Sequence, residues 1–323
     1  MTESSQAISP TEELRALAAA LESEGVSFRL GGVRGRDLTT FKIGGEFSLL
    51  IEPRNAEEAV ASLRLARDLR LALKILGEGS NLLVPDRGVY EPVIRYRGRA
   101  SEVFDAENGA AVEVEAGAPL MSLSRSLSDV GLSGLEFAGG IPGSLGGAVF
   151  MNAGAHGSSM QEIVEWVEVA TASGVLRLSG SELAWRYRSS GLKDYIAKRL
   201  GEDCSWLIVR LRLRLSRADP EATKGKRARY LSERRARQPL QSPCAGSIFK
   251  NPSVENPAWA VIERAGLKGA CIGGASVSTM HANWIVNGEQ KATAEDVVKL
   301  IRRIKSEVFE SQRVVLEEEL VCW

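Results

Sequence analysis

The sequence predicts an α+β protein in which a larger N-terminal domain is followed by a smaller α/β domain. Three observations lead to this prediction. Strand and helix patterns alternate over residues 47–130, hairpin patterns follow, and the composition becomes basic and polar over 217–238. A length of 323 residues with 44% hydrophobic residues is enough for two globular cores. We therefore expect one domain at 1–217, with a helical lead at 1–38, and a second at 218–323.

The N-terminal lead and the unit after it carry clear helix signals. Ser9 is expected to cap a helix that has Pro10 in its first turn, and Gly25 is expected to end it. The strand–helix–strand unit that follows comprises a strand at 47–52, a helix capped by Asn55 with Glu58, and a strand at 73–76.

The region after residue 110 changes from helices to hairpins. A strand at 111–115 and a helix at 120–130 precede a hairpin over 164–178, whose turn contains Ser173 and Gly174. Aliphatic residues alternate with arginines over 207–215. This alternation predicts a strand with one buried face and one solvated face.

The composition shifts in the stretch 217–238, which gathers Lys224, Lys226, Arg227, Arg229, Arg234, Arg235 and Arg237. An exposed linker and helix face is the simplest interpretation, and guidance of an anionic substrate is the alternative. Further on, Thr293 followed by Asp296 predicts the N-terminus of a helix in the C-terminal domain.

The overall composition excludes several classes of function. Lysine plus arginine equals aspartate plus glutamate at 41 each, so a nucleic-acid partner is not expected. Two histidines and four widely spaced cysteines argue against a metal site and a disulfide framework, so no metal is expected. A polar N-terminus and the lack of an 18-residue apolar run predict neither a secretory signal nor a membrane span. We expect a cytoplasmic protein with reduced thiols.

Two glycine-rich loops are the first candidate functional features. One runs over 77–84 directly after a predicted strand, and the other runs over 139–148 and continues to Ala155. Glycines let backbone N–H groups converge, and such concavities hold phosphate oxygens. Neither loop has the spacing of a dinucleotide-binding Rossmann fingerprint or of a Walker loop. Tight turns alone are the alternative interpretation, which two such loops in one domain make less attractive.

The C-terminal region carries a second set of polar residues. Ser247 lies between Gly246 and the segment Phe249-Lys250-Asn251-Pro252, which suits a polar pocket. Two arginines at 186 and 188 lie upstream, and three glutamates at 317–319 lie near the end of the chain. A serine nucleophile of the Ser–His–Asp kind is not favoured, because the Gly-x-Ser-x-Gly elbow is missing. Taken alone, Ser247 could be a turn residue and the glutamates an exposed face.

The order and spacing of these motifs resemble the UDP-N-acetylenolpyruvoylglucosamine reductase family over nearly the whole chain, from Thr39 to Glu319. The motifs are Gly-Ser-Asn-Leu-Leu-Val, Gly-Ile-Pro-Gly, Met-Asn-Ala-Gly-Ala, Tyr-Arg-x-Ser, Gly-Ser-x-Phe-Lys-Asn-Pro and Ala-Gly-Leu-Lys-Gly. The resemblance implies an FAD-binding domain of the vanillyl-alcohol-oxidase (PCMH) type followed by a substrate-binding domain. It also implies non-covalently held FAD and NADPH as co-substrate.

The family's FAD contacts would fall on two loops and their neighbours. The implied residues are Ile43 and Gly44; Gly77, Glu78, Gly79, Ser80, Asn81 and Leu82; Gly140, Ile141, Pro142, Gly143 and Ser144; and Ala153 and Gly154. This set agrees with the phosphate-binding interpretation of the glycine-rich loops.

The implied reaction reduces the enolpyruvyl group of UDP-N-acetylglucosamine enolpyruvate to the lactyl ether of UDP-N-acetylmuramate, in peptidoglycan precursor synthesis. Hydride would pass from NADPH through FAD to the vinyl carbon. By motif match Ser247 would donate the proton, Arg188 would stabilise the developing carboxylate charge, and Glu319 would complete the catalytic set. Weaker matches for substrate contacts are Tyr187, Lys250, Asn251, His281 and Asn283.

The chain also departs from the family pattern. Glu318 stands where proline is frequent, so the register of the final motif rests on Leu320, which follows Glu319. Cys244 stands where serine is usual and places a thiol near the site. The interval from Arg188 to Gln238 is too short for the tyrosine-bearing loop of one subgroup, so we expect the subgroup without it, and a monomer. Two alternatives remain, an oxidase of the same fold and a nucleotide-sugar-binding protein without catalysis.

Overall fold

The computed structural model describes residues 10–106, 109–201 and 204–323. Its N-terminal region contains a four-stranded sheet in the order β1-β2-β5-β3. The strands are β1 (Phe28–Arg34), β2 (Glu46–Ile51), β5 (Val93–Ile94) and β3 (Lys74–Ile75). The first pair is antiparallel, and β5 lies parallel to both β2 and β3. The helices of this region are α1 (Glu12–Ser23), α2 (Gly35–Leu38) and α3 (Ala56–Asp68).

A larger antiparallel sheet follows, in the order β12-β11-β13-β7-β6. Its strands are β6 (Ser101–Ala106), β7 (Gly109–Glu115), β11 (Val164–Thr171), β12 (Gly174–Ser179) and β13 (Trp206–Arg217), and β8 (Leu132–Ser133) pairs with the end of β13. Its longer helices are α4 (Leu120–Asp129), α5 (Leu145–Phe150) and α6 (Leu192–Leu200). The short elements between them are η1 (Glu136–Gly140), β9 (Gly154–Ala155), β10 (Ser158–Ser159), η2 (Met160–Glu162) and η3 (Gly180–Glu182).

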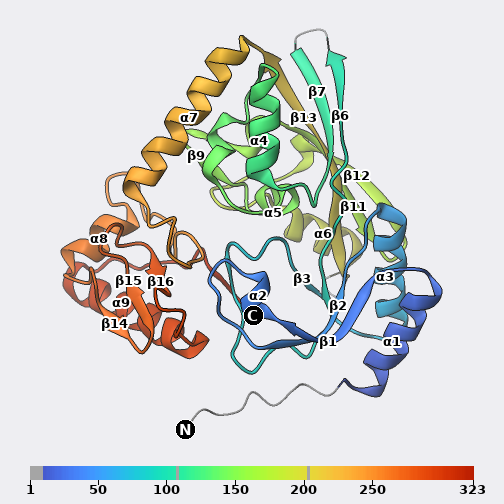
Figure 1. Cartoon of the computed structure of the whole chain (residues 1–323), viewed down its shortest axis with the longest axis horizontal. Coiled ribbons are helices and arrows are strands. Elements are labelled where there is room, and N and C mark those ends of the chain that lie inside the picture. Colours follow the sequence, from blue (N-terminus) through green and yellow to red (C-terminus); the bar gives the residue numbers. More distant parts are fainter. Residues whose placement is uncertain (1–9, 107–108, 202–203) are drawn as a thin grey trace.

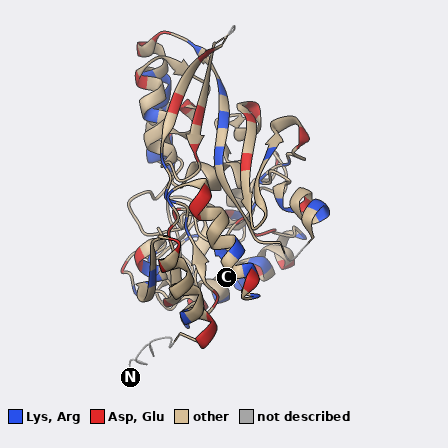
Figure 2. Ribbon diagram, turned by 90° about the vertical axis from the view of Figure 1, so that its right-hand side faces the viewer, with Lys and Arg blue, Asp and Glu red and all other residues tan. Residues whose placement is uncertain are grey.

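The two sheets share one hydrophobic core. Helix α3 contacts β11 and β13 of the larger sheet and also α1, so these helices lie between the sheets. On the solvated face of the larger sheet, Glu113 pairs with Arg210 at 2.5 Å and with Arg212 at 2.9 Å. In Figure 2 acidic and basic residues lie on neighbouring strands of the ribbon. The predicted alternation of β13 is therefore confirmed, since its leucines are buried and its arginines face solvent or carboxylates.

The basic stretch forms helix α7 (Pro220–Arg237), which runs from the end of the larger sheet toward the C-terminal lobe (Figure 1). One face packs against α4 and η1. Thr223 on that face donates a hydrogen bond of 2.7 Å to the carbonyl of Ser128. The stretch is thus a helix that is docked through one face, and the predicted exposed helix face is the remainder of its surface.

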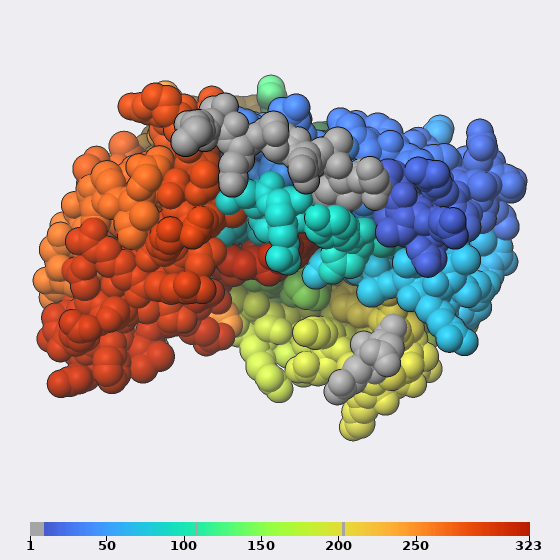
Figure 3. All heavy atoms as spheres, turned by 90° about the horizontal axis from the view of Figure 1, so that it is seen from below, coloured from blue at the N-terminus to red at the C-terminus, as the bar shows by residue number. Residues whose placement is uncertain are grey.

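The C-terminal lobe has its own core but is joined to the N-terminal region at several points. Its elements are α8 (Ala258–Arg264), β14 (Cys271–Ile272), β15 (Ala275–Val277), β16 (Ile285–Val286) and α9 (Ala294–Gln312). The core of the lobe includes Phe41, Ile43 and Leu83 from the N-terminal region. The last strand, β17 (Val321–Cys322), pairs in parallel with β4 (Leu82–Leu83). Figure 3 shows the lobe in contact with the N-terminal half of the molecule.

A carboxylate from the N-terminal region caps the longest helix of the lobe. Asp86 accepts hydrogen bonds from the backbone N–H groups of Ala294 at 2.9 Å and Glu295 at 3.2 Å. These groups lie in the first turn of α9, where a negative charge is stabilised by the helix dipole. The lobe is therefore fixed to the loop that follows β4.

Most predicted helix boundaries are confirmed, and one is wrong. Asn55 caps α3 and Thr293 caps α9 with Asp296, as predicted. Helix α1 is capped by Thr11, whose hydroxyl accepts from the N–H of Leu14 at 3.4 Å, and not by Ser9, which lies outside the described residues. Pro10 therefore precedes the helix instead of starting it. No helix among the described residues is long and apolar enough to cross a membrane.

Candidate active site

Arg188 and Glu319 form an ion pair, with 2.8 Å between Nε and Oε1. Arg188 lies in a turn closed by backbone hydrogen bonds between Arg186 and Ser189. Its backbone φ is +59°, a left-handed conformation that costs a non-glycine residue about 1 kcal/mol or more. The guanidinium also donates from Nη1 to the carbonyl of Gly154 at 3.2 Å. A strained turn thus directs this cation toward the end of the second glycine-rich loop.

The segment that follows Ser247 pairs through its backbone with the segment that contains Glu319. The N–H of Glu319 donates to the carbonyl of Ile248 at 2.8 Å, and the N–H of Lys250 donates to the carbonyl of Glu317 at 2.8 Å. Since Ser247 directly precedes Ile248, its backbone lies next to the segment that carries Glu319. Ser247 is half-buried. Arg188, Glu319 and the segment that contains Ser247 therefore lie close together, although 131 positions separate Arg188 from Glu319 in the sequence.

Burial of the Glu319 carboxyl raises its pKa above the ordinary value for glutamate, because removal from water disfavours the charged form. The cations Arg188 and Lys250 oppose this rise and only partly offset it. Arg188 and Lys250 therefore favour the ionised form of Glu319, and burial favours the protonated form.

The two glycine-rich loops lie against each other. The hydroxyl of Ser80 donates to the carbonyl of Pro142 at 3.0 Å. A Cβ atom on Gly77 would lie 2.9 Å from Oγ of Ser144. Loop 77–82 and loop 140–144 are thus neighbours, as a shared phosphate-binding role requires.

Gly79 is the position in the first loop that least tolerates a side chain. Its φ is +63°, and an added Cβ would lie 2.4 Å from the carbonyl oxygen of Leu38. We expect Gly79→Ala to destabilise the protein by more than the ~1–2 kcal/mol of left-handed strain and to weaken FAD retention. Thermal unfolding and flavin content after gel filtration measure both effects.

Gly32→Ala is the matched control for this substitution. Gly32 has a φ of +70°, and no described atom lies within 4 Å of an added Cβ. This variant should show the backbone strain alone and retain FAD. Equal flavin loss in both variants would contradict a specific role for the loop.

A cavity of about 510 Å³ opens beside the two loops. Glu78, Ser80 and Pro142 line it from the glycine-rich loops, and Cys244 and Gly246 line it from the C-terminal region. The cavity therefore extends from the loops to Gly246, the residue directly before the candidate proton donor Ser247. A volume of this size is typical of small-molecule and cofactor sites.

The other residues implied for FAD binding have varied surroundings. The side chains of Ile43 and Leu82 are buried in hydrophobic clusters. The side-chain amide of Asn81 donates to the carbonyl of Glu319 at 2.9 Å, which couples the first loop to the catalytic residues. Gly154 contributes the carbonyl that Arg188 binds.

The residues implied for substrate binding have mainly structural contacts in the described protein. Both ends of the Asn283 amide bind the backbone of Phe249, at 3.0 and 2.8 Å, and Asn251 accepts from the N–H of Ala258 at 3.0 Å. Lys250 pairs with Glu317. The imidazole of His281 accepts from the N–H of Asn283 at 3.3 Å, and burial lowers its pKa.

Tyr187 is exposed, with the Arg188 guanidinium 5.1 Å from the centre of its ring. Direct substrate contacts by Tyr187 and by the C-terminal residues of this set stay predictions.

Arg95, which lines the cavity, belongs to none of the motifs that marked the other candidate residues. Its side chain is 11% exposed, and its guanidinium pairs with Glu78 at 2.6 Å. Burial lowers the pKa of Arg95, and Glu78 opposes that shift. Arg95 directly follows the buried residues Val93 and Ile94. An arginine at such a position could have been recognised in the sequence as a buried charge, which needs a partner.

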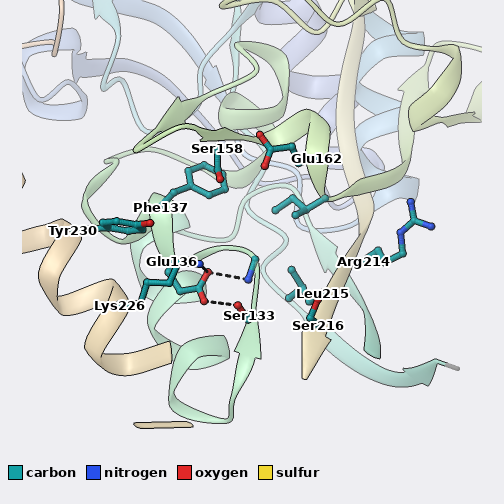
Figure 4. Close-up of a pocket in the computed structure, with 12 residues that line it drawn as sticks. Ser133, Glu136, Phe137, Ser158, Glu162, Arg214, Leu215, Ser216, Lys226 and Tyr230 are labelled. Atoms are coloured by element: carbon teal, nitrogen blue, oxygen red, sulfur yellow. Dashed lines mark hydrogen bonds and ion pairs between the residues drawn. The ribbon is translucent and has the colours of Figure 1, made fainter. Parts of the chain in front are cut away.

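A second cavity, of about 340 Å³, lies near α7 and η1 and contains none of the predicted site residues (Figure 4). Glu136 is its most buried charge and accepts from Ser133 at 2.6 Å and from the N–H of Gly134 at 2.9 Å. Burial alone would raise the pKa of Glu136, but these hydrogen bonds and Lys226 lower it. The ionised carboxylate holds η1 in place, and η1 leads directly into the second glycine-rich loop.

Two family models match this chain. A model described as an FAD binding domain matches residues 47–179, and a model of the C-terminal domain of UDP-N-acetylenolpyruvoylglucosamine reductase matches residues 238–323. The predicted fold class, an FAD-binding domain of the PCMH type followed by a smaller α/β domain, is confirmed by these matches.

Individual relatives match over nearly their whole length. The UDP-N-acetylenolpyruvoylglucosamine reductase of Halalkalibacterium halodurans is 40% identical over 284 residues, which cover 87% of this chain and 90% of the relative. That of Bacillus subtilis is 39% identical over 283 residues, covering 87% and 89%. The crystal structure of the Thermus caldophilus enzyme aligns with a TM-score of 0.74 at 34% identity, covering 92% of this chain and 98% of that one.

Proposed function

Because the chain belongs to the UDP-N-acetylenolpyruvoylglucosamine reductase family, we propose that Ser247, Arg188 and Glu319 form the centre at which it reduces the enolpyruvyl group of its UDP-sugar. The activity is that of a UDP-N-acetylmuramate dehydrogenase in peptidoglycan precursor synthesis. The ion pair between Arg188 and Glu319, beside the segment of Ser247, is the observation that supports this assignment most.

The residues around the larger cavity fit FAD. Two contacting glycine-rich loops offer converging backbone N–H groups, and the 510 Å³ cavity extends from them to Gly246. When bound there, FAD would take hydride from NADPH and pass it to the vinyl carbon of the substrate. We propose that the cofactor is held without a covalent bond, by loops 77–82 and 140–144.

Each catalytic side chain has a separate proposed role. Ser247 donates a proton from its hydroxyl to the carbon next to the substrate carboxylate. Arg188 binds that carboxylate and stabilises the negative charge that develops on it. Glu319 orients the guanidinium and takes part in proton transfer. Glu317 pairs with Lys250, and Glu318 pairs with Lys305. Of the three glutamates only Glu319 pairs with Arg188, which supports Glu319 as the catalytic one.

The pH dependence of the substrate half-reaction tests the role of Glu319. Its pKa is raised by burial, so it gains a proton at a higher pH than an exposed glutamate does. We expect the rate to fall as the pH drops through that raised pKa, because a neutral Glu319 no longer holds Arg188. Glu319→Gln should lose this acid limb and react slowly at every pH. A wild-type profile in the variant would exclude the role.

The same shift predicts a stability effect of opposite direction. A group with a raised pKa in the folded state binds more protons when folded, so its contribution to stability is full below its unfolded pKa. That contribution is lost as the pH rises through the folded pKa. The free energy of unfolding should therefore decline in the wild type as the pH rises from the unfolded to the folded pKa of Glu319. The same measurement on Glu319→Gln should not show this decline.

Absorbance of the purified protein tests the proposed reaction as a whole. The protein should be yellow, NADPH should bleach it without the substrate, and the enolpyruvyl UDP-sugar should restore the colour faster than oxygen does. Acid precipitation should release all of the flavin into solution if the binding is non-covalent. A colourless protein that still binds the UDP-sugar would instead indicate a binding protein without catalysis.

We also propose the finer properties that sequence analysis predicted. These are a monomeric, cytoplasmic enzyme of the subgroup without the tyrosine-bearing loop, with domains at 1–217 and 218–323. The free thiols of all four cysteines support a reducing compartment. Size-exclusion chromatography with light scattering measures the oligomeric state.

A further inference from the structure

Arg234 is a largely buried cation without a carboxylate partner in the described protein. No described carboxylate oxygen lies within 4.0 Å of its guanidinium, and its Nε is buried without a hydrogen-bond acceptor. Arg188 and Arg95 pair with Glu319 and Glu78, whereas the Nε of Arg227, like that of Arg234, is buried without an acceptor among the described residues. A buried charge without a partner is strongly unfavourable, so Arg234 requires an anion from elsewhere.

The surroundings of Arg234 place it beside the second glycine-rich loop. It lies in the last turn of α7, and a Cβ on Gly140 would lie 2.8 Å from its Cδ. Arg227 lies seven residues earlier on the same face of α7 and packs in the same way on Gly139, where an added Cβ would lie 2.6 Å from its Cγ. The glycines therefore leave room for two arginine side chains, of which Arg234 is nearer the catalytic residues.

The groups whose charges act on Arg234 show that it lies near the cavity and near the catalytic residues. Burial lowers its pKa to about 10, which leaves it protonated at neutral pH. The neighbouring groups that shift this pKa are Cys244, which raises it, and Arg188, which lowers it. Cys244 lines the 510 Å³ cavity. Arg188 and Glu319 neutralise each other. The positive charge of Arg234 is therefore not compensated in this part of the site.

We infer that Arg234 neutralises negative charge of the bound FAD, and thereby favours the reduced over the oxidised cofactor. This inference rests on the proposed FAD site. The FAD diphosphate is always anionic, and the ring system gains negative charge on two-electron reduction. The contact of Arg234 with Gly140, in a loop of the matched FAD-binding region, favours FAD over the UDP-sugar as the source of the anion.

The midpoint potential of the flavin in the holoenzyme is the decisive measurement. Arg234→Met removes the charge but keeps an unbranched stem against Gly140, so the fold should survive, and Arg234→Gln is a second neutral variant. We expect the preference for reduced FAD to fall about tenfold in each, a potential roughly 30 mV lower for a two-electron couple. Arg234→Lys should restore most of the loss. Arg235→Gln, an exposed neighbour on the same helix, should keep the wild-type potential.

The outcomes separate this inference from the proposed function. If the neutral variants keep the wild-type potential and flavin content, or change only the KM for the UDP-sugar, Arg234 does not serve FAD and the inference fails. Loss of flavin with an unchanged potential in the fraction that retains it would place the charge at the diphosphate and overturn the claim about reduction. A wild-type protein that holds no flavin would overturn the proposed function as well.

Discussion

Ser247→Ala is expected to slow reoxidation of the NADPH-reduced enzyme by the enolpyruvyl UDP-sugar by about 10²–10⁴-fold, the usual contribution of a positioned general acid. Alanine lacks the hydroxyl that donates the proton but keeps the backbone that pairs residues 248–250 with residues 317–320. Reduction by NADPH should therefore proceed at the wild-type rate. Stopped-flow absorbance at the flavin bands separates the two half-reactions.

Ser253→Ala is a suitable control for this variant. Ser253 lies six residues further along and contributes a hydroxyl that accepts from the N–H of Asn256 at 3.1 Å, away from the residues that line the cavity. Both half-reactions should keep their wild-type rates in it. Wild-type reoxidation of Ser247→Ala would show that another group donates the proton.

Arg188→Met is expected to reduce the rate of the same half-reaction by about 10²–10³-fold, as removal of one preorganised electrostatic contact does. Methionine fills similar volume but offers no charge to the substrate carboxylate. Arg188 also lowers the pKa of Glu319 against the effect of burial. The acid limb of the pH profile arises when neutral Glu319 no longer holds Arg188, so it should be absent in the variant, a change that a merely structural role of Arg188 would not produce.

The control for Arg188→Met is Arg186→Met. Arg186 lies two residues earlier with a side chain that is 72% exposed. It should keep the wild-type rate and pH profile. The double variant Arg188→Met/Glu319→Gln should lose much less than the product of the two single losses, since the two side chains act as one pair. Fully multiplicative losses would indicate that they act independently.

Local sequence signals determined much of the fold. The side chains of Asn55 and Thr293 accept hydrogen bonds from the backbone three residues later, so their helices could be located from the sequence alone. The prediction for α1 chose the wrong cap, because Ser9 and Thr11 both precede suitable residues and only the path of the backbone decides between them. Helix α7 was only partly recognised, because its apolar content is low and its buried face contains Thr223 and arginine stems.

Motif order along the chain determined the family and the candidate residues. The motifs indicated Arg188, Ser247 and Glu319 as candidate catalytic residues. Without the motifs, each of these residues had an ordinary structural explanation. Tertiary structure decided that Glu319, and not Glu317 or Glu318, faces Arg188. It did so through backbone pairing of residues 248–250 with 317–320, which no local pattern encodes.

The sequence by itself determined the fold class, most of the helix caps, the two glycine-rich loops and the family, because these depend on local patterns and on their order. Only the tertiary structure decided which charges are paired and which are not. Arg95 gained Glu78 as its partner and Arg188 gained Glu319, while Arg234 was buried on Gly140 without a carboxylate among the described residues. Burial and charge pairing depend on segments that meet in space from distant parts of the chain, so the chemistry of the site is a property of the folded molecule.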